Sequence, residues 1–211
     1  IQNQNNTDMK IEIVGDSAIR AYKQTKYWAF EQRLYMYARF SKPFVYTIVD
    51  DSITGRKGDT QRRLKALLKF PDTAEGEQIM VKVGTSAVDA EGAEKNLNAE
   101  IAAWDFDGVR NDARKAWNDY LSTIEVSSES IDDLRIFYTA LYHTAISPNL
   151  FTDADGRYLG MDLEAHEGSV EKPIYTIFSL LDTYRALHPL YTIIDPKLNN
   201  DFIRSLLTKY Q

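Results

Sequence analysis

In the first part of the chain, apolar and polar positions alternate with a period of two residues. Between residues 34 and 40, Leu34, Met36 and Ala38 alternate with Tyr35 and Tyr37. This alternation is typical of a strand with one buried face. Similar stretches predict further strands at residues 10–14, 18–23, 44–49, 64–70 and 78–83. Short strands separated by turn-forming residues predict a β-sandwich.

Aromatic side chains are concentrated in this strand-rich part. They are Tyr22, Tyr27, Trp28, Phe30, Tyr35 and Tyr37. Aromatic rings stack on the apolar faces of sugars, so these residues could line a carbohydrate-binding surface. Packing in the core and between neighbouring strands explains them equally well. Both interpretations therefore stay open.

From residue 87 onwards the apolar spacing becomes helical. Residues 93–102 and 106–121 are helical by composition, and either Asp105 or Asp107 would cap the second helix. Ser130, followed by Asp132 and Asp133, predicts the start of a third helix, whose apolar stripe ends before Pro148. A final helix is predicted over residues 200–210.

The stretch 174–196 combines a helical apolar stripe with two charged residues. Pro173 suits the first position of a helix that begins at Ile174, and Pro189 would follow the end of that helix. Asp182 and Arg185 lie three residues apart within it. Charged side chains inside so apolar a segment need a partner or a ligand. They could pair with each other, as residues at this spacing do on a helix, or face a binding cleft.

Composition and charge exclude several functions. A formal charge of -6 and a pI near 5.2 argue against a nucleic-acid partner, because such binding depends on Lys and Arg. The absence of cysteine excludes disulfides and Cys-ligated metals. The three histidines, His143, His166 and His188, form no zinc-binding pattern. No apolar run is long enough to span a bilayer.

The segment 151–162 contains Asp153-Ala154-Asp155-Gly156, which is similar to part of a calcium loop. An EF-hand needs a third ligand before its glycine and a glutamate six residues after it. Here the glycine comes too early and Asp162 stands in place of the glutamate. A tight Asp-Gly hairpin turn, with Gly156 at positive φ, is the favoured interpretation.

Two long motifs resemble a known family. They are F-Y-T-A-L-Y-H-T-A-I-S-P-N-L-F-T-D-A-D-G-R-Y-L-G-M-D (residues 137–162) and S-L-L-D-T-Y-R-A-L-H-P-L-Y-T-I-I-D-P (residues 179–196). Together with V-K-V-G-T-S (81–86), W-D-F-D-G-V-R-N-D-A-R-K-A-W-N (104–118) and F-S-K-P-F (40–44), they resemble the calcium-dependent exo-α-mannosidases of glycoside hydrolase family 92. The resemblance covers nearly the whole chain.

The resemblance implies an α+β multidomain fold. Residues 1–88 would be the end of an N-terminal β-sandwich, 89–127 a helical linker, and 128–211 the first helices of an (α/α)6 toroid. The activity would be inverting hydrolysis of α-linked mannose from glycans. A general acid and a separate carboxylate base, roughly 6.5–9.5 Å apart, perform this reaction. Calcium would contact the mannose hydroxyls. A periplasmic, outer-surface or secreted location is implied.

The resemblance assigns substrate-binding roles to four residues. Asp182 matches a position expected to hydrogen-bond mannose hydroxyls, and Arg185 would hold that carboxylate or reach the sugar. Arg157 and Asp162, in the R-Y-x-G-M-D stretch, are candidates for orienting the substrate. Leu181 stands where the family usually has Trp, which alters the shape of the subsite.

The resemblance also predicts that catalytic groups lie elsewhere. The general acid, the base and the calcium ligands are expected beyond Gln211, so the 211 residues alone are expected to be inactive. A non-catalytic carbohydrate-binding or scaffold module is the alternative. A lid or dimerisation element is a third possibility, since an incomplete toroid would expose apolar helix faces.

Overall fold

A computed structural model describes residues 5–26, 29–50, 53–54, 60–61, 63–71, 73–177 and 179–210. Two compact units make up the chain. The first contains residues 1–104, 153–159 and 164–167, and the second contains 105–152, 160–163 and 168–211. The division after Trp104 lies inside the range 89–127 that was predicted as a linker. No helix among the described residues is long and apolar enough to cross a membrane.

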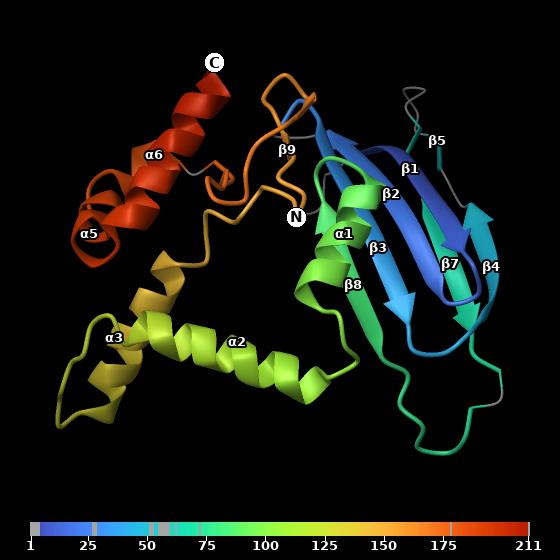
Figure 1. The fold of residues 1–211 in the computed structure, drawn as a ribbon, viewed down its shortest axis with the longest axis horizontal. Coiled ribbons are helices and arrows are strands. Elements are labelled where there is room, and N and C mark those ends of the chain that lie inside the picture. The colour runs from blue at the N-terminus through green and yellow to red at the C-terminus, as the bar shows by residue number, and fades with distance from the viewer. Residues whose placement is uncertain are drawn as a thin grey trace. The chain divides into compact units, whose positions relative to one another are not determined.

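The first unit is built on an antiparallel four-stranded sheet in the order β1-β2-β3-β8 (Figure 1). Its strands are β1 (Asn5–Val14), β2 (Ala18–Lys26), β3 (Gln32–Phe40) and β8 (Val81–Ser86). The strands β4 (Val45–Asp50) and β7 (Leu64–Lys69) pair with each other, as do β5 (Ile53–Thr54) and β6 (Thr60–Gln61). This confirms the β-rich first part of the chain.

The last strand lies three residues later than predicted. The prediction placed it at 78–83, whereas β8 spans Val81–Ser86. Met80 exchanges hydrogen bonds with Ser41 instead of joining the ladder: its N–H donates to the Ser41 hydroxyl over 2.9 Å, and its carbonyl accepts from the Ser41 N–H. Residue 80 thus bonds to the residue that follows β3, and β8 begins only at Val81.

Helix α1 (Ala90–Glu100) covers the face of the sheet that carries the tyrosines of β3 (Figure 1). Ala18 and Tyr37 of the sheet and Ala93 and Leu97 of the helix form a buried cluster. The prediction of one buried face for β3 is therefore wrong, because Tyr37 on one face and Ala38 on the other are 6% and 4% exposed. Periodicity identifies the two faces of a strand but not which of them a later helix will cover.

Some aromatic side chains of this sheet pack against each other across neighbouring strands. Tyr22 and Tyr35 are cross-strand partners whose rings stack with centroids 4.8 Å apart. Phe30 is 77% exposed and has the ammonium of Lys26 over its ring. Tyr27 and Trp28 lie outside the described residues. Cross-strand packing is confirmed for the Tyr22–Tyr35 pair.

The second unit is helical, and two of its predicted N-caps are confirmed. Helix α2 (Phe106–Leu121) is capped by Asp105, whose carboxylate accepts from the Gly108 N–H over 2.8 Å. Helix α3 (Ile131–Thr144) is capped by Ser130, whose hydroxyl accepts from the Asp133 N–H over 3.2 Å. Each cap satisfies one of the N–H groups that a helix start leaves unpaired.

The predicted helix beginning at Ile174 is wrong. Residue 174 is not helical: its carbonyl accepts from the Phe151 N–H over 2.7 Å and its own N–H donates to the Thr152 hydroxyl. Helical structure appears only as α4 (Leu180–Thr183) and α5 (Leu187–Ile194). Pro189 lies in the first turn of α5 and does not end a helix, since N–H groups in a first turn have no intrahelical acceptor.

The last helix, α6 (Pro196–Tyr210), starts four residues earlier than predicted and packs against α5. Pro196 takes its first position, as the missing N–H permits. Tyr191 of α5 is 1% exposed and its ring meets that of Phe202 edge-on at 5.4 Å. Figure 1 shows α5 and α6 as neighbouring helices joined by a short turn.

Candidate functional site

Asp182 lies on α4, a single helical turn, and its side chain is exposed. Arg185 follows α4 and is exposed too. Its Nε donates to the hydroxyl of Tyr184 over 3.0 Å, and its guanidinium lies 5.4 Å from the centroid of that ring. Among the described residues, no ion pair joins Asp182 to Arg185. The pairing that their spacing allowed is therefore not formed.

The exposure of this segment changes the reason for expecting a ligand there. Leu181 is 80% exposed and Tyr184 is 55% exposed. Because Asp182 and Arg185 are exposed as well, water solvates their charges and neither needs a partner to offset burial. What the structure offers is an accessible carboxylate beside an accessible apolar side chain, with a guanidinium held against an aromatic ring three residues away.

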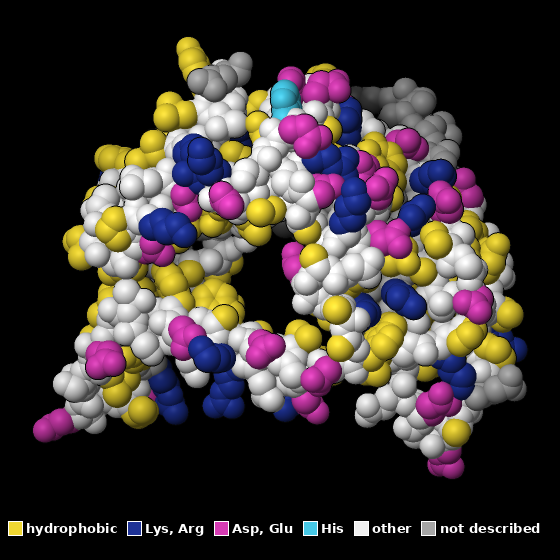
Figure 2. Space-filling view, in the orientation of Figure 1, with side chains coloured by type: hydrophobic (Ala, Val, Ile, Leu, Met, Phe, Trp, Pro, Cys, Tyr) yellow, Lys and Arg dark blue, Asp and Glu magenta, His cyan; other side chains and the backbone are white. Residues whose placement is uncertain are grey.

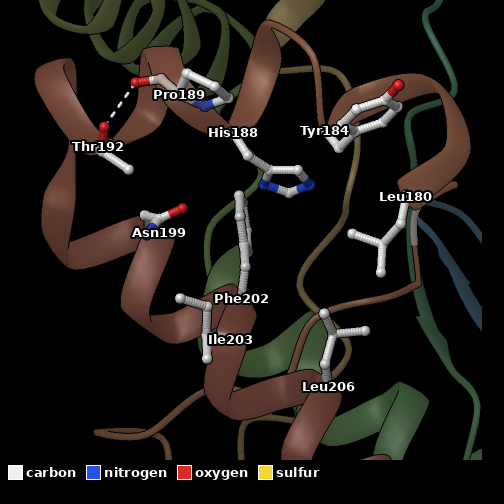
Figure 3. Close-up of a pocket in the computed structure, with 9 residues that line it drawn as sticks. All are labelled: Leu180, Tyr184, His188, Pro189, Thr192, Asn199, Phe202, Ile203 and Leu206. Atoms are coloured by element: carbon white, nitrogen blue, oxygen red, sulfur yellow. Dashed lines mark hydrogen bonds between the residues drawn. The ribbon is translucent and has the colours of Figure 1, made fainter.

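A pocket of about 560 Å³ lies next to this segment, among α4, α5 and α6 (Figure 3). Its lining is mostly apolar, with Leu180 and Tyr184 on the α4 side and Phe202 and Ile203 on α6. The imidazole Nε2 of His188 is 3.0 Å from the hydroxyl of Thr183. Neither Asp182 nor Arg185 lines this pocket.

Arg157 belongs to the first unit and lies in a network of carboxylates. Its two terminal nitrogens donate to the two oxygens of Asp89, over 2.7 and 3.3 Å, and its Nε donates to Asp155 over 2.9 Å. Lys95 contacts the same oxygen of Asp155 at 3.1 Å. The hydrogen bonds from Arg157 lower the pKa of Asp89, and those to Asp89 raise the pKa of Arg157 itself. For Asp155, burial acts against the hydrogen bonds from Lys95 and Arg157, which prevail and lower its pKa.

Asp153 is buried beside this network, with 4% of its surface exposed. One carboxylate oxygen accepts from the Ser86 hydroxyl over 2.6 Å, and the other accepts from the Asn96 amide over 2.7 Å. Burial raises the pKa of Asp153 despite these bonds. Gly92 provides the space, because a Cβ there would lie 2.3 Å from the carboxylate.

These contacts argue against calcium in the 153–162 loop. The oxygens of Asp153 and Asp155 are directed at protein donors, and among the described residues no group of three or more His, Cys, Asp or Glu could hold a metal ion. Gly156 has a φ of +92°, and its N–H donates to the Asp153 carbonyl over 2.8 Å. The tight turn with Gly156 at positive φ is confirmed, although no paired strands flank it.

Asp162 lies in the connection between β9 (Tyr158–Leu159) and β10 (Ala165–His166). These two strands form an antiparallel hairpin whose tip is 160–164. Asp162 is exposed, and the next residue, Leu163, has a φ of +66°. Left-handed backbone is unfavourable for a side chain such as Leu, so the tip is strained.

The four predicted residues therefore occupy three places. Asp182 and Arg185 lie near each other in the second unit, Arg157 lies in the first, and Asp162 lies at the tip of the hairpin that follows Arg157. Asp89 and Ser86, which hold the Arg157 segment, were missed by sequence reasoning. Asp89 is 68 residues from Arg157 and Ser86 is 67 residues from Asp153, and no local pattern indicates such pairing.

Two family models match this chain. Residues 92–211 match the glycosyl hydrolase family 92 catalytic domain, and residues 1–86 match the glycosyl hydrolase family 92 N-terminal domain. An uncharacterized secreted glycosidase of Arthroderma benhamiae is 32% identical over 123 residues, which are 56% of this chain and 15% of that protein.

Solved structures are similar over nearly the whole chain. A family GH92 alpha-mannosidase from Bacteroides thetaiotaomicron is 32% identical, with a TM-score of 0.88 over 98% of this chain and 29% of that one. The same enzyme in complex with mannoimidazole has a TM-score of 0.87. An inverting GH92 mannosidase from that organism is 26% identical, with a TM-score of 0.80. The match covers 97% of this chain and 29% of the mannosidase chain. This chain thus spans less than a third of these relatives.

Proposed function

Because this chain belongs to glycosyl hydrolase family 92, we propose that it forms part of an enzyme that removes α-linked mannose from glycans. The observation that carries this proposal is the similarity to a family GH92 alpha-mannosidase, at 32% identity over 98% of the chain. The mannoimidazole complex of that enzyme supports a mannose-containing substrate. The name of the Arthroderma relative supports a secreted location.

Within such an enzyme, the first unit would belong to an N-terminal β-sandwich. Helices α3, α5 and α6 would be the first helices of an (α/α)6 toroid. The three-part division at 88 and 127 is proposed on the same basis. The chain spans 29% of the solved mannosidase, so we place the general acid and the base in parts of the protein outside these residues.

Asp182 and Arg185 are the proposed mannose-binding residues. An exposed carboxylate can accept two hydrogen bonds from adjacent sugar hydroxyls, and bonds to a charged acceptor are stronger than neutral ones. Arg185, held against the Tyr184 ring, can donate to the same sugar from its terminal nitrogens. Leu181 offers an apolar contact where a larger aromatic side chain would cover more of the sugar. These groups bind and orient the substrate, whereas the proton transfers need other residues.

Calcium dependence and inversion are proposed for the whole enzyme only. Asp153 and Asp155 of the 153–162 loop do not form a calcium site, since their carboxylates are bonded to Ser86, Asn96, Lys95 and Arg157. No step that these residues perform is therefore assigned to a metal. The name of the second Bacteroides relative supports inversion.

The full-length protein tests the proposal directly. It should hydrolyse an aryl α-mannoside, release mannose from α-linked mannobiose, lose activity in a chelator and regain it with calcium. Proton NMR of the first product should show β-mannose before mutarotation, as inversion requires. If the full-length protein binds mannan but releases no mannose, the carbohydrate-binding module replaces the enzyme as the conclusion.

A further inference from the structure

We propose that Arg157 is a positioning residue: paired with Asp89, it fixes the base of the β9–β10 hairpin, whose tip carries Asp162. The role of this tip in mannose binding rests on the proposed function, whereas the fixing of the base does not. The resemblance made Arg157 a substrate contact. The structure assigns its guanidinium to the protein instead.

The guanidinium of Arg157 already donates to carboxylates of the protein, so few of its N–H groups remain for a sugar. Each of its three nitrogens donates to a carboxylate, and its side chain is 20% exposed. The pair with Asp89 is bidentate, the arrangement in which guanidinium and carboxylate match best. Turning the guanidinium toward a substrate would break these bonds and leave the Asp89 charge uncompensated.

The partners of Arg157 are themselves held by the first unit. Asp89 is the N-cap of α1, and its Oδ1 accepts from the Gly92 N–H over 2.6 Å. Asp155 is held by Lys95 of the same helix. Two further bonds fix the segment just before Arg157: Asp153 accepts from Ser86 at the end of β8, and the Ala154 N–H donates to the Asn96 amide oxygen over 2.6 Å.

The fixed segment leads straight into the hairpin. The Arg157 carbonyl accepts from the Asp153 N–H over 2.8 Å, which closes the turn, and β9 begins at the next residue. There Tyr158 pairs with His166 and their rings stack with centroids 5.6 Å apart. The base of the hairpin is thus attached to α1 within one residue of Arg157. Figure 2 shows the charged side chains of this region gathered over the first unit.

Strain at the tip is consistent with a fixed base. The positive φ of Leu163 is costly for a non-glycine residue and persists only where the surrounding structure imposes it. A hairpin free to move at its base could relax this residue. The bonds of Arg157 and Asp155 to the α1 region limit such motion at the base.

A double-mutant cycle in the full-length protein tests the pairing. Arg157→Met removes the guanidinium, and Asp89→Asn removes the charge while leaving an amide oxygen that can cap α1. Each single variant should lower the thermal midpoint and raise amide exchange at residues 157–166, and the double variant should change neither measurement much further.

Arg157→Lys keeps the charge without the bidentate geometry, and it serves as the informative variant if Arg157→Met does not fold. Lys115→Met, which breaks an exposed ion pair with Asp119 on α2, is the control and should change neither measurement.

Kinetics then separate positioning from substrate contact. If Arg157 positions the hairpin, Asp89→Asn and Arg157→Met should lower kcat/KM by similar factors, about tenfold to a hundredfold, as small displacements of an active-site element do. If Arg157 contacts mannose, Arg157→Met should lower kcat/KM while Asp89→Asn does not, and exchange in the hairpin should stay at its wild-type rate. That result overturns the proposal. A wild-type protein without mannosidase activity would refute the proposed function, and the thermal and exchange measurements would still decide whether the base is fixed.

Discussion

At the scale of single residues, Asp182 gives the most direct test of the proposed mannose contact, because its side chain is exposed and its loss should spare the fold. We expect Asp182→Ala to lower kcat/KM of the full-length enzyme by about 2–3 kcal/mol, the cost of a lost hydrogen bond to a charged group. Steady-state kinetics on a small mannoside measures this. Glu129→Ala, at another exposed acidic position, is the control. Unchanged kinetics with a lower thermal midpoint would make Asp182 structural.

The pairing of Asp89 with Arg157 predicts a pH dependence of stability. Arg157 lowers the pKa of folded Asp89 below its unfolded value of about 3.9, so the pair contributes fully above that pH and is lost as the pH falls through the folded pKa. We expect the difference in thermal midpoint between wild type and Asp89→Asn to shrink below about pH 4. Thermal unfolding from pH 3 to 7 measures it, and a difference constant across this range would contradict the prediction.

At the scale of elements, the approach of α1 to the sheet depends on Gly84 in β8. A Cβ at this position would lie 2.2 Å from the Ala93 carbonyl oxygen and 2.8 Å from the Leu97 Cβ. We therefore expect Gly84→Ala to destabilise the protein by about 1–3 kcal/mol, because the helix backbone must move. Urea unfolding measures this. Thr47→Ala at an exposed position of β4 should cost less, and equal effects would refute the close approach.

The success of sequence reasoning differed among elements for physical reasons. The caps Asp105 and Ser130 were predictable, because a capping side chain bonds to a residue three positions away. The helix expected from Ile174 failed because that residue bonds to Phe151 and Thr152, more than twenty residues earlier, and tertiary bonds overrode the apolar spacing. The family was recognised from motifs, but the partners of Arg157 were not, since the Asp89 contact joins distant parts of the chain.

At the scale of the whole molecule, large apolar side chains are exposed in the helical unit. Figure 2 shows some of them on the face in view, over α5 and α6. They include Ile193 at 79%, Leu207 at 60% and Tyr210 at 91% exposed. Soluble monomers seldom leave groups of such residues uncovered, so these faces favour contact with other protein surface.

We expect the 211 residues expressed alone to self-associate and to hydrolyse no α-mannoside, while the full-length protein is active. Light scattering after gel filtration measures the first property, and an assay with calcium supplied measures the second. Ile193→Ser with Leu207→Ser should reduce association if the α5 and α6 faces drive it. A monodisperse monomer would remove the case for a dimerisation element, and turnover by the 211 residues would place the catalytic pair within them.

The bonds between the α1 region and residues 153–157 also bear on the order in which the protein folds during synthesis. Ser86 and Asp89 leave the ribosome 67 and 68 residues before Asp153 and Arg157. At about 5–20 residues per second, the sheet and α1 wait several seconds for the segment that completes them. In that interval Ser86 and Asn96 have no Asp153 carboxylate to which they can donate. Another segment of the nascent chain could bond to them first, and slow translation across residues 105–152 would prolong the interval.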